Sequence, residues 1–364
     1  MISSVQVVPT AFRGGRIVDG YRSGIAAMHE VLLLLVVATG LIAGVYYFMV
    51  TIGGTPTNSD PVNIRPIYNI AVDDDERSMW VSRLREDLVR IDLETGEILS
   101  AFPTSGMTVS AAAHSRDGLT SLVCGAERSV VLFREGLPTE VVEMPEADSI
   151  DVAVTDDCAV ALATFNDGRI RAMCWRRGEC RDFYCEANRC ADVVGLCVNS
   201  TCRHVLVARR DASASFFDLE DGHVEGEILN IGPNAISVAW SHDESLVAVV
   251  TQDCQVRIYD VPARRLVRQG VLDVERRSID KATVVISPDQ RRLAVSILSD
   301  AGLVLWDLES GTTVGKLNCH GVAIPTVQFS TDSERLFSGG YDGAIRVWSL
   351  TSFSQLRIVS ENSK

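Results

Sequence analysis

Residues 336 to 349 read Leu336-Phe-Ser-Gly-Gly-Tyr-Asp-Gly-Ala-Ile-Arg-Val-Trp348-Ser349, and this stretch decides the fold of the chain. Glycines and an aspartate at its centre predict a turn between two short apolar runs. In the second run β-branched residues alternate with Arg346 and Trp348, which is typical of a β-strand. Weaker relatives of the stretch end in Trp306-Asp307, Tyr259-Asp260, Phe217-Asp218 and Ile91-Asp92. The stretch is therefore one copy of a repeat.

The repeat has a period of about 42 residues when its copies are aligned on the position of Trp348. Large apolar residues occupy this position in every copy: Ile91, Phe133, Met173, Phe217, Tyr259, Trp306 and Trp348. Acids stand six residues earlier at Asp342, Asp300, Asp253, Asp211, Asp167 and Glu127, with Arg85 as the exception. A period of about 40 to 45 residues built from short strands is typical of a propeller blade. The sequence thus predicts an all-β, seven-bladed β-propeller.

Each copy is predicted to form four short strands, because polar clusters that favour tight turns interrupt its apolar runs. The turn between the second and third strands contains the acids Asp167, Asp211, Asp253 and Asp300, to which we assign a structural role as acceptors for backbone amides. Packing of the last blade on the first is expected to close the ring, helped by residues 62–65. The predicted blades span 66–105, 106–147, 148–190, 191–233, 234–277, 278–321 and 322–360.

Residues 318–349 resemble a WD-repeat. The stretch from Asn318 to Ser330 is similar to the segment that leads into the first strand of that family's repeat. The sixth copy keeps Ser296, Asp300 and Trp306 but has no histidine at the matching place. For the seventh copy, the resemblance implies a hydrogen-bonded structural tetrad made of His320, Ser338, Asp342 and Trp348.

An uncharged apolar run from Val31 to Ile52 precedes the repeats. About 20 such residues cross the hydrocarbon core of a bilayer as a helix, so residues 31–52 are predicted to form one transmembrane helix. The alternative is a cleavable signal peptide, although its apolar core is usually only about 7 to 15 residues long. The predicted organisation is a tail (1–30), the helix (31–52), a linker (53–65) and the propeller (66–360).

Basic residues on the two sides of this run predict its orientation. Arg13, Arg16 and Arg22 precede it, whereas only Arg65 follows it closely. The positive-inside tendency therefore places the N-terminus in the cytoplasm and the propeller outside it. If Met28 is the true start, these three arginines are absent and the orientation is open.

The chain is acidic, with 34 Lys and Arg against 48 Asp and Glu and a formal net charge of -14. Binding of nucleic acid requires a basic stripe that neutralises phosphates. Pairs of arginines do occur, but they are scattered among the blades. The composition therefore argues against a nucleic-acid partner.

Six of the ten cysteines cluster in the third and fourth copies: Cys174, Cys180, Cys185, Cys190, Cys197 and Cys202. The cluster contains no Cys-x-x-Cys pair, which disfavours a zinc site. In an oxidising compartment it could form disulfides, and Cys180 with Cys202 is one geometrically possible pair because both are expected on the same rim. The alternative is a set of buried thiols that pack as small apolar side chains.

Catalytic motifs are missing from the sequence. The six histidines have no metal-helix spacing, and neither a Gly-x-Ser-x-Gly elbow nor a phosphate loop occurs. No cofactor is therefore expected, and the first hypothesis is a membrane-anchored, non-catalytic scaffold for a protein or peptide. The alternative is a propeller enzyme of the lactonase or hydrolase type, with a metal in the axial channel.

The WD-repeat resemblance implies that a partner binds the top face of the propeller. Loops between the second and third strands contribute to this face in the family. Exposed arginine and tyrosine side chains are good interface anchors. The matching positions, taken as candidate partner-binding residues, are Arg83, Arg85, Asn166, Arg209, Arg210, Gln252, Ser299 and Tyr341.

Overall fold

The structure is a computed structural model that describes the chain from residue 66 to residue 359, with gaps. The gaps are residues 74–75, 84–85, 103, 105–108, 116–119, 126–127, 135–136, 138, 145–148, 155–157, 165–169, 177–178, 186–192, 200, 210–211, 221, 276–277, 300–301 and 319. The predicted tail, transmembrane helix and linker lie outside the described residues. Within the described part of the chain, no helix has the length and apolar character needed to span a membrane.

Blades 1 to 4 each contain four consecutive strands. Blade 1 comprises β1 (Ile67–Val72), β2 (Ser78–Arg83), β3 (Leu88–Asp92) and β4 (Ile98–Phe102). Blade 2 comprises β5 (Val109–His114), β6 (Thr120–Gly125), β7 (Ser129–Arg134) and β8 (Glu140–Glu143). Blade 3 comprises β9 (Ser149–Val154), β10 (Cys158–Thr164), β11 (Ile170–Arg176) and β12 (Glu179–Cys185). Blade 4 comprises β13 (Val193–Val198), β14 (His204–Arg209), β15 (Ser213–Asp218) and β16 (Val224–Leu229).

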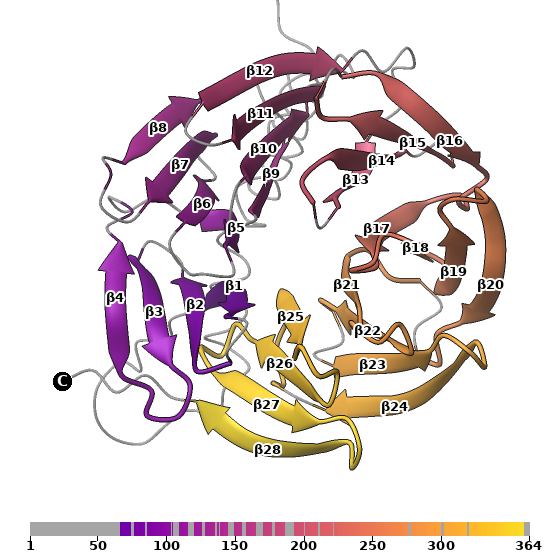
Figure 1. Cartoon of the computed structure of the whole chain (residues 1–364). Coiled ribbons are helices and arrows are strands. Elements are labelled where there is room, and N and C mark those ends of the chain that lie inside the picture. The colour runs from indigo at the N-terminus through magenta and orange to yellow at the C-terminus, as the bar shows by residue number, and fades with distance from the viewer. Residues whose placement is uncertain are drawn as a thin grey trace, which may run out of the picture. The chain divides into compact units, whose positions relative to one another are not determined.

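Blades 5 to 7 follow the same plan and complete a ring (Figure 1). Blade 5 comprises β17 (Ala235–Trp240), β18 (Leu246–Thr251), β19 (Gln255–Asp260) and β20 (Arg265–Val271). Blade 6 comprises β21 (Ala282–Ile286), β22 (Arg292–Ile297), β23 (Gly302–Asp307) and β24 (Thr312–Asn318). Blade 7 comprises β25 (Thr326–Phe329), β26 (Arg335–Gly339), β27 (Ile345–Ser349) and β28 (Ser354–Val359). The predicted all-β, seven-bladed propeller is confirmed.

The first strand of each blade lies innermost and the fourth lies on the outer rim (Figure 1). Neighbouring blades sandwich the second strands, so every residue of β2 is buried, whereas no residue of the outer strand β20 is. We call the face formed by the loops between second and third strands, and between successive blades, the top face. The opposite face, formed by the other turns, is the bottom face.

Two turn motifs on the bottom face explain why the repeat has a fixed period. An aspartate at the end of the third strand accepts backbone N–H bonds from the next turn, as Asp92 does from Thr95 (2.7 Å) and Asp307 from Ser310 (2.7 Å). These bonds, from Thr95 and Ser310 respectively, lower the pKa of both carboxyls. Between the first two strands a serine hydroxyl accepts a backbone N–H, as Ser287 does from Arg292 (2.9 Å). The same side-chain chemistry thus recurs at corresponding turns of several blades.

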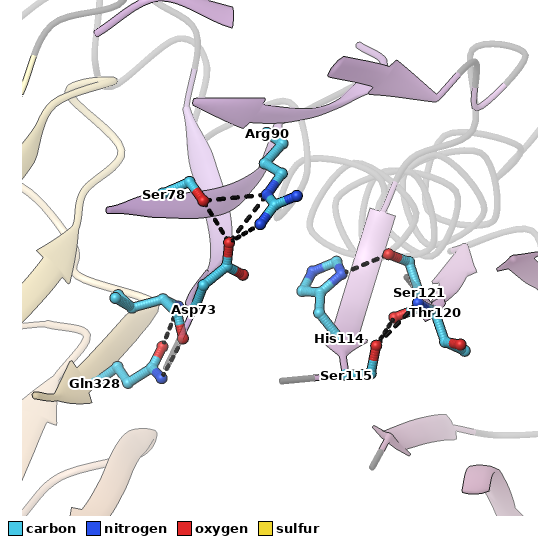
Figure 2. Close-up of polar contacts among 9 residues, drawn as sticks. Asp73, Ser78, Arg90, His114, Ser115, Thr120, Ser121 and Gln328 are labelled. Atoms are coloured by element: carbon cyan, nitrogen blue, oxygen red, sulfur yellow. Dashed lines mark hydrogen bonds and ion pairs between the residues drawn. The ribbon is translucent and has the colours of Figure 1, made fainter. Parts of the chain in front are cut away.

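The ring closes without exchange of a strand, because blades 1 and 7 are each built from consecutive strands. Three kinds of contact hold the seam between them. The side-chain amide of Gln328, which is labelled in Figure 2, accepts from Val72 N (2.8 Å) and donates to Val72 O (3.4 Å). Arg335 forms an ion pair with Glu76. Buried apolar residues of both blades, among them Ile67 and Phe337, form one cluster.

Aromatic stacking joins blades 1 and 2. The indole of Trp80 lies 5.1 Å from the ring of His114 at an interplanar angle of 12°. Arg90, which donates to Asp73 through Nε (2.9 Å), lies over the same indole at 5.9 Å. Figure 2 shows Arg90 with Asp73 and Ser78, and His114 bonded through Nδ1 to Ser121 Oγ (2.9 Å).

We expect His114 to make the protein less stable as the pH falls from about 6.5 to about 5. Burial lowers the pKa of His114 to about 3, whereas a histidine in an unfolded chain titrates near 6.5. Between these values the unfolded chain binds a proton that the folded chain does not, so stability rises with pH. Urea unfolding at the two pH values should show a loss of about 1.6 kcal/mol that His114→Gln largely removes. Equal losses in both proteins would contradict this origin.

Candidate interaction surface

The structure brings together the four residues of the tetrad in blade 7. His320 Nε2 and Ser338 Oγ are 2.8 Å apart, and His320 Nδ1 and Asp342 Oδ1 are 2.8 Å apart. Trp348 donates from Nε1 to Ser338 Oγ at 2.9 Å. Burial raises the pKa of Asp342, but hydrogen bonds from His320 and Arg346 outweigh this and keep the pKa below its usual value. The network ties the loop before β25 to β26, to β27 and to the turn between them.

Gly340 is required by this geometry. A Cβ atom at this position would lie 2.2 Å from His320 Nδ1 and 2.6 Å from Asp342 Oδ1. Any larger residue would therefore push the imidazole away from the carboxylate. Gly340, which belongs to the stretch 336–349, thus leaves the space that His320 and Asp342 need for their hydrogen bond.

Blade 6 contains only part of this network. Ser296 Oγ donates to the backbone oxygen of Ile324 (2.5 Å), and the buried Trp306 Nε1 has no hydrogen-bond partner among the described residues. Asp300 lies outside the described residues. The matching tryptophans of blades 6 and 7 therefore differ in the bond that Nε1 makes.

This difference predicts unequal costs for the same substitution. Trp348→Phe should destabilise the protein by about 1 to 2 kcal/mol more than Trp306→Phe, because only the first loses a buried hydrogen bond. Both changes remove similar apolar volume, so each serves as the control for the other. The measurement is the free energy of unfolding in urea, and equal costs would show that the bond to Ser338 contributes nothing net.

The acids predicted in the other top-face turns are described only in part. Asp253 accepts a hydrogen bond from Thr251 Oγ1 at 2.5 Å. Asp167, Asp211 and Asp300 lie outside the described residues, so their role stays a prediction.

Arg83 and Arg209 are buried, with 3% and 4% of their surfaces exposed, so the expectation that they anchor a partner as exposed residues is wrong. Each is the last residue of a second strand. Arg209 donates from Nη1 to Ser215 Oγ (2.6 Å) within blade 4. Arg85, Asn166 and Arg210 lie outside the described residues.

Three of the candidate partner-binding residues are accessible on the top face. Ser299 is exposed, and Gln252 is half-buried and donates from Nε2 to Asp280 Oδ1 (3.4 Å). Tyr341 is half-buried and packs on Tyr68, with ring centroids 5.3 Å apart at 42°. Burial raises the pKa of Tyr341 to about 12, and it also raises the pKa of Tyr68.

Tyr68 was not anticipated from the sequence. It lies at the start of β1, where Ile67 N donates to Gly340 O (3.2 Å) across the seam. The sequence places Tyr68 in the first strand of the first blade. Because the first blade must contact the last blade in a closed ring, this position could have indicated that Tyr68 lies at the seam. The two tyrosines form an aromatic pair on the top face at the seam.

Carboxylates outnumber cations in the described loops of the top face. The acids are Glu86, Asp87, Asp253, Asp273, Glu275, Asp280 and Asp342, against Arg128 and Lys281. This excess matches the net charge of the whole chain. The described loops of the top face therefore carry excess negative charge.

One group of possible metal donors occurs within the described residues: His204, Asp218 and Glu225 in blade 4. His204 Nε2 lies 3.2 Å from Glu225 Oε2 and 3.9 Å from Asp218 Oδ2. Asn199 Oδ1 accepts the backbone amides of residues 203 and 204, so its Nδ2 faces His204 Nδ1 (3.1 Å) as a donor. This leaves the ring hydrogen on Nε2, pointing at the carboxylates. The imidazole of His204 is thus held by hydrogen bonds to side chains of its own blade. The group lies on the second to fourth strands of blade 4, away from the axial channel.

The structure does not support the predicted disulfides for the members whose side chains are described, Cys174, Cys197 and Cys202. The suggested pair of Cys180 with Cys202 stays a prediction. Cys174 and Cys202 are buried together in the apolar cluster between blades 3 and 4, where they pack as small hydrophobic side chains. The side chains of Cys180, Cys185 and Cys190 lie outside the described part.

Comparison with known proteins supports the repeat assignment. Residues 226–260 and 311–349 match the family model described as WD domain, G-beta repeat. The second of these segments contains Ser338, Asp342 and Trp348.

Curated relatives share limited parts of the chain. Autophagy-related protein 16 of Arabidopsis thaliana is 26% identical over 159 residues, which are 42% of this chain and 29% of that protein. The guanine nucleotide-binding protein subunit beta of Saccharomyces cerevisiae is 38% identical over 58 residues, 16% of this chain and 14% of that protein. Transcription factor unc-37 of Caenorhabditis elegans is 32% identical over 79 residues, 22% of this chain and 13% of that protein. The chain thus spans less than a third of the length of these relatives.

A solved structure shows the same fold. The β-propeller domain of Cps50 (Swd1) from Myceliophteria thermophila superposes with a TM-score of 0.67 at 15% identity, covering 81% of this chain and 100% of that one. With the matched segments, this likeness establishes that the chain carries WD40 repeats within a seven-bladed β-propeller.

Proposed function

We propose that the chain is a membrane-tethered, non-catalytic scaffold whose top face binds a protein or peptide. The observation that carries this proposal is the Tyr68–Tyr341 pair, because partly exposed tyrosines on a rigid frame are frequent interface anchors. The acidic loops around the pair favour a partner segment that carries lysine or arginine. One relative is by its name a subunit of a larger protein, which agrees with a role in assembly.

Loss of the partner on changing Tyr341 tests this function. Partners should be cross-linked in the native membrane and recovered with the wild-type chain and with Tyr341→Ala. Removing an interface anchor typically weakens binding by tenfold or more, so the partner should fall by about that factor. Phe353→Ala, on the bottom face of the same blade, should retain it. Equal recovery with Tyr341→Ala would contradict the proposal.

We also infer that residues 31–52 tether the propeller to a membrane, with the propeller on the extracytoplasmic side. The support is the length and uncharged composition of this run. The full chain should remain with membranes in alkaline carbonate, and a chain without residues 31–52 should be released. Protease added to intact cells or spheroplasts should digest the propeller, and protection would reverse the orientation.

The thermal stability of a non-catalytic scaffold should not depend on metal ions. Calcium or zinc, and chelator, should each change the melting temperature of the full chain by less than about 1 °C, because no native metal site contributes to stability. The enzyme alternative requires a channel metal and predicts a rise with calcium that chelator reverses. Differential scanning fluorimetry distinguishes the two.

A further inference from the structure

A pocket of about 240 Å³ opens on the bottom face between blades 4 and 5. We call it the blade 4–5 pocket, and its lining includes His204, Phe216, Glu225, Trp240, Glu244 and Arg264. His204 begins β14 and Trp240 ends β17, which places the pocket at the end of the blades opposite Tyr341. It is therefore separate from the proposed partner surface on the top face.

Its aromatic wall is held in place by neighbouring groups. Trp240 donates from Nε1 to the backbone oxygen of Glu244 (3.1 Å). The ring of Phe216 meets the indole edge to face, with centroids 5.4 Å apart at 65°. Phe216 is 5% exposed, whereas Trp240 is only half-buried. A fixed, accessible indole attracts cations through its ring quadrupole.

Carboxylates stand beside this wall. The side chain of Glu225 is 42% exposed and accepts from the fixed His204 Nε2 (3.2 Å), which leaves further acceptor positions on the carboxylate. Asp218 lies behind His204 (3.9 Å from Nε2) and is paired with Arg203 (3.6 Å), so it adds no uncompensated charge. Glu244 is the second acid of the lining.

Arg264 forms one edge of the pocket. It donates from Nη2 to the backbone oxygen of Glu225 (2.8 Å), and its guanidinium lies over Gly226, where a Cβ would be 2.1 Å from Cζ. It forms no ion pair with a carboxylate among the described residues. The two lining acids, Glu225 and Glu244, against this one guanidinium leave the pocket with excess negative charge.

We propose that the blade 4–5 pocket binds the cationic side chain of an arginine or lysine from a partner chain. The side chain lies against Trp240 and its charged group pairs with Glu225. The volume accommodates one long side chain. The site is a second, independent binding site on the face opposite the tyrosine pair.

Fluorine NMR of the full chain labelled with 5-fluorotryptophan tests this site, with the Trp240 signal assigned from Trp240→Phe. The probes are acetyl-Gly-Gly-Arg-Gly-Gly-amide, its lysine and trimethyllysine versions, and a version with citrulline, the neutral analogue of arginine. The cationic peptides should shift the Trp240 signal saturably, and the citrulline peptide should not. A citrulline response equal to that of arginine would overturn the proposal.

Charge variants give the second readout. Glu225→Gln should weaken binding of the arginine peptide about fivefold, since it removes a charge-assisted contact, and Arg264→Gln should strengthen it about threefold by removing a like charge. Glu143→Gln, on the outer strand β8, is the matched control and should leave binding unchanged. If Glu225→Gln fails to fold, Arg264→Gln decides alone: unchanged or weaker binding overturns the proposal.

Discussion

Phe337→Ala is expected to destabilise the protein by about 4 kcal/mol, the usual cost of removing a fully buried phenylalanine from a core. Phe337 is 0% exposed and belongs to the cluster that joins blade 7 to Ile67, Ile70 and Val81 of blade 1. No strand is shared across this seam, so apolar packing and a few polar contacts alone keep the ring closed. A cavity here therefore weakens closure as well as one blade.

The control for this change is Phe353→Ala in the same blade. Phe353 is 37% exposed in the turn before β28, so its truncation should cost about 1 kcal/mol or less. The free energy of unfolding of each variant is measured in urea by tryptophan fluorescence. Similar costs at the two positions would show that the seam does not depend on this cluster.

His320→Ala is expected to cost about 3 kcal/mol. The imidazole side chain is 0% exposed and bonds to Ser338 on one side and Asp342 on the other, so its loss leaves buried polar groups without their partner. The loop before β25 would also lose its tie to blade 7. The measurement is again the free energy of unfolding.

His242→Ala provides the comparison for His320. His242 is exposed in a turn of blade 5, and surface substitutions of this kind usually change stability by about 0.5 kcal/mol or less. A loss at His320 no larger than at His242 would mean that the tetrad contributes no net stability.

The fold could be predicted because the residues that determine it are close in sequence. Asp307 and Ser287 each accept a hydrogen bond from a backbone amide a few residues away, so the same residue types recur wherever the same turn recurs. The tetrad is similarly local, since its four residues lie close together in the sequence, between His320 and Trp348. Periodic local chemistry of this kind is readable without knowledge of tertiary contacts.

The surface was harder to predict because it depends on packing between blades. Arg83 and Arg209 occupy loop-adjacent positions that suggest exposure, yet both are buried. Tyr68 meets Tyr341 only because the two ends of the repeat come together at the seam. Cys174 and Cys202 likewise became core residues through contact between two blades.

The most direct test of the top-face scaffold is site-specific photo-cross-linking in the native membrane. The photoreactive residue p-benzoylphenylalanine replaces Tyr341 in one chain and Val141, which is 60% exposed on the outer strand β8, in another. We predict a discrete light-dependent protein adduct at Tyr341 and none at Val141. The absence of an adduct at Tyr341, or the same adduct at both positions, would contradict a partner-binding top face.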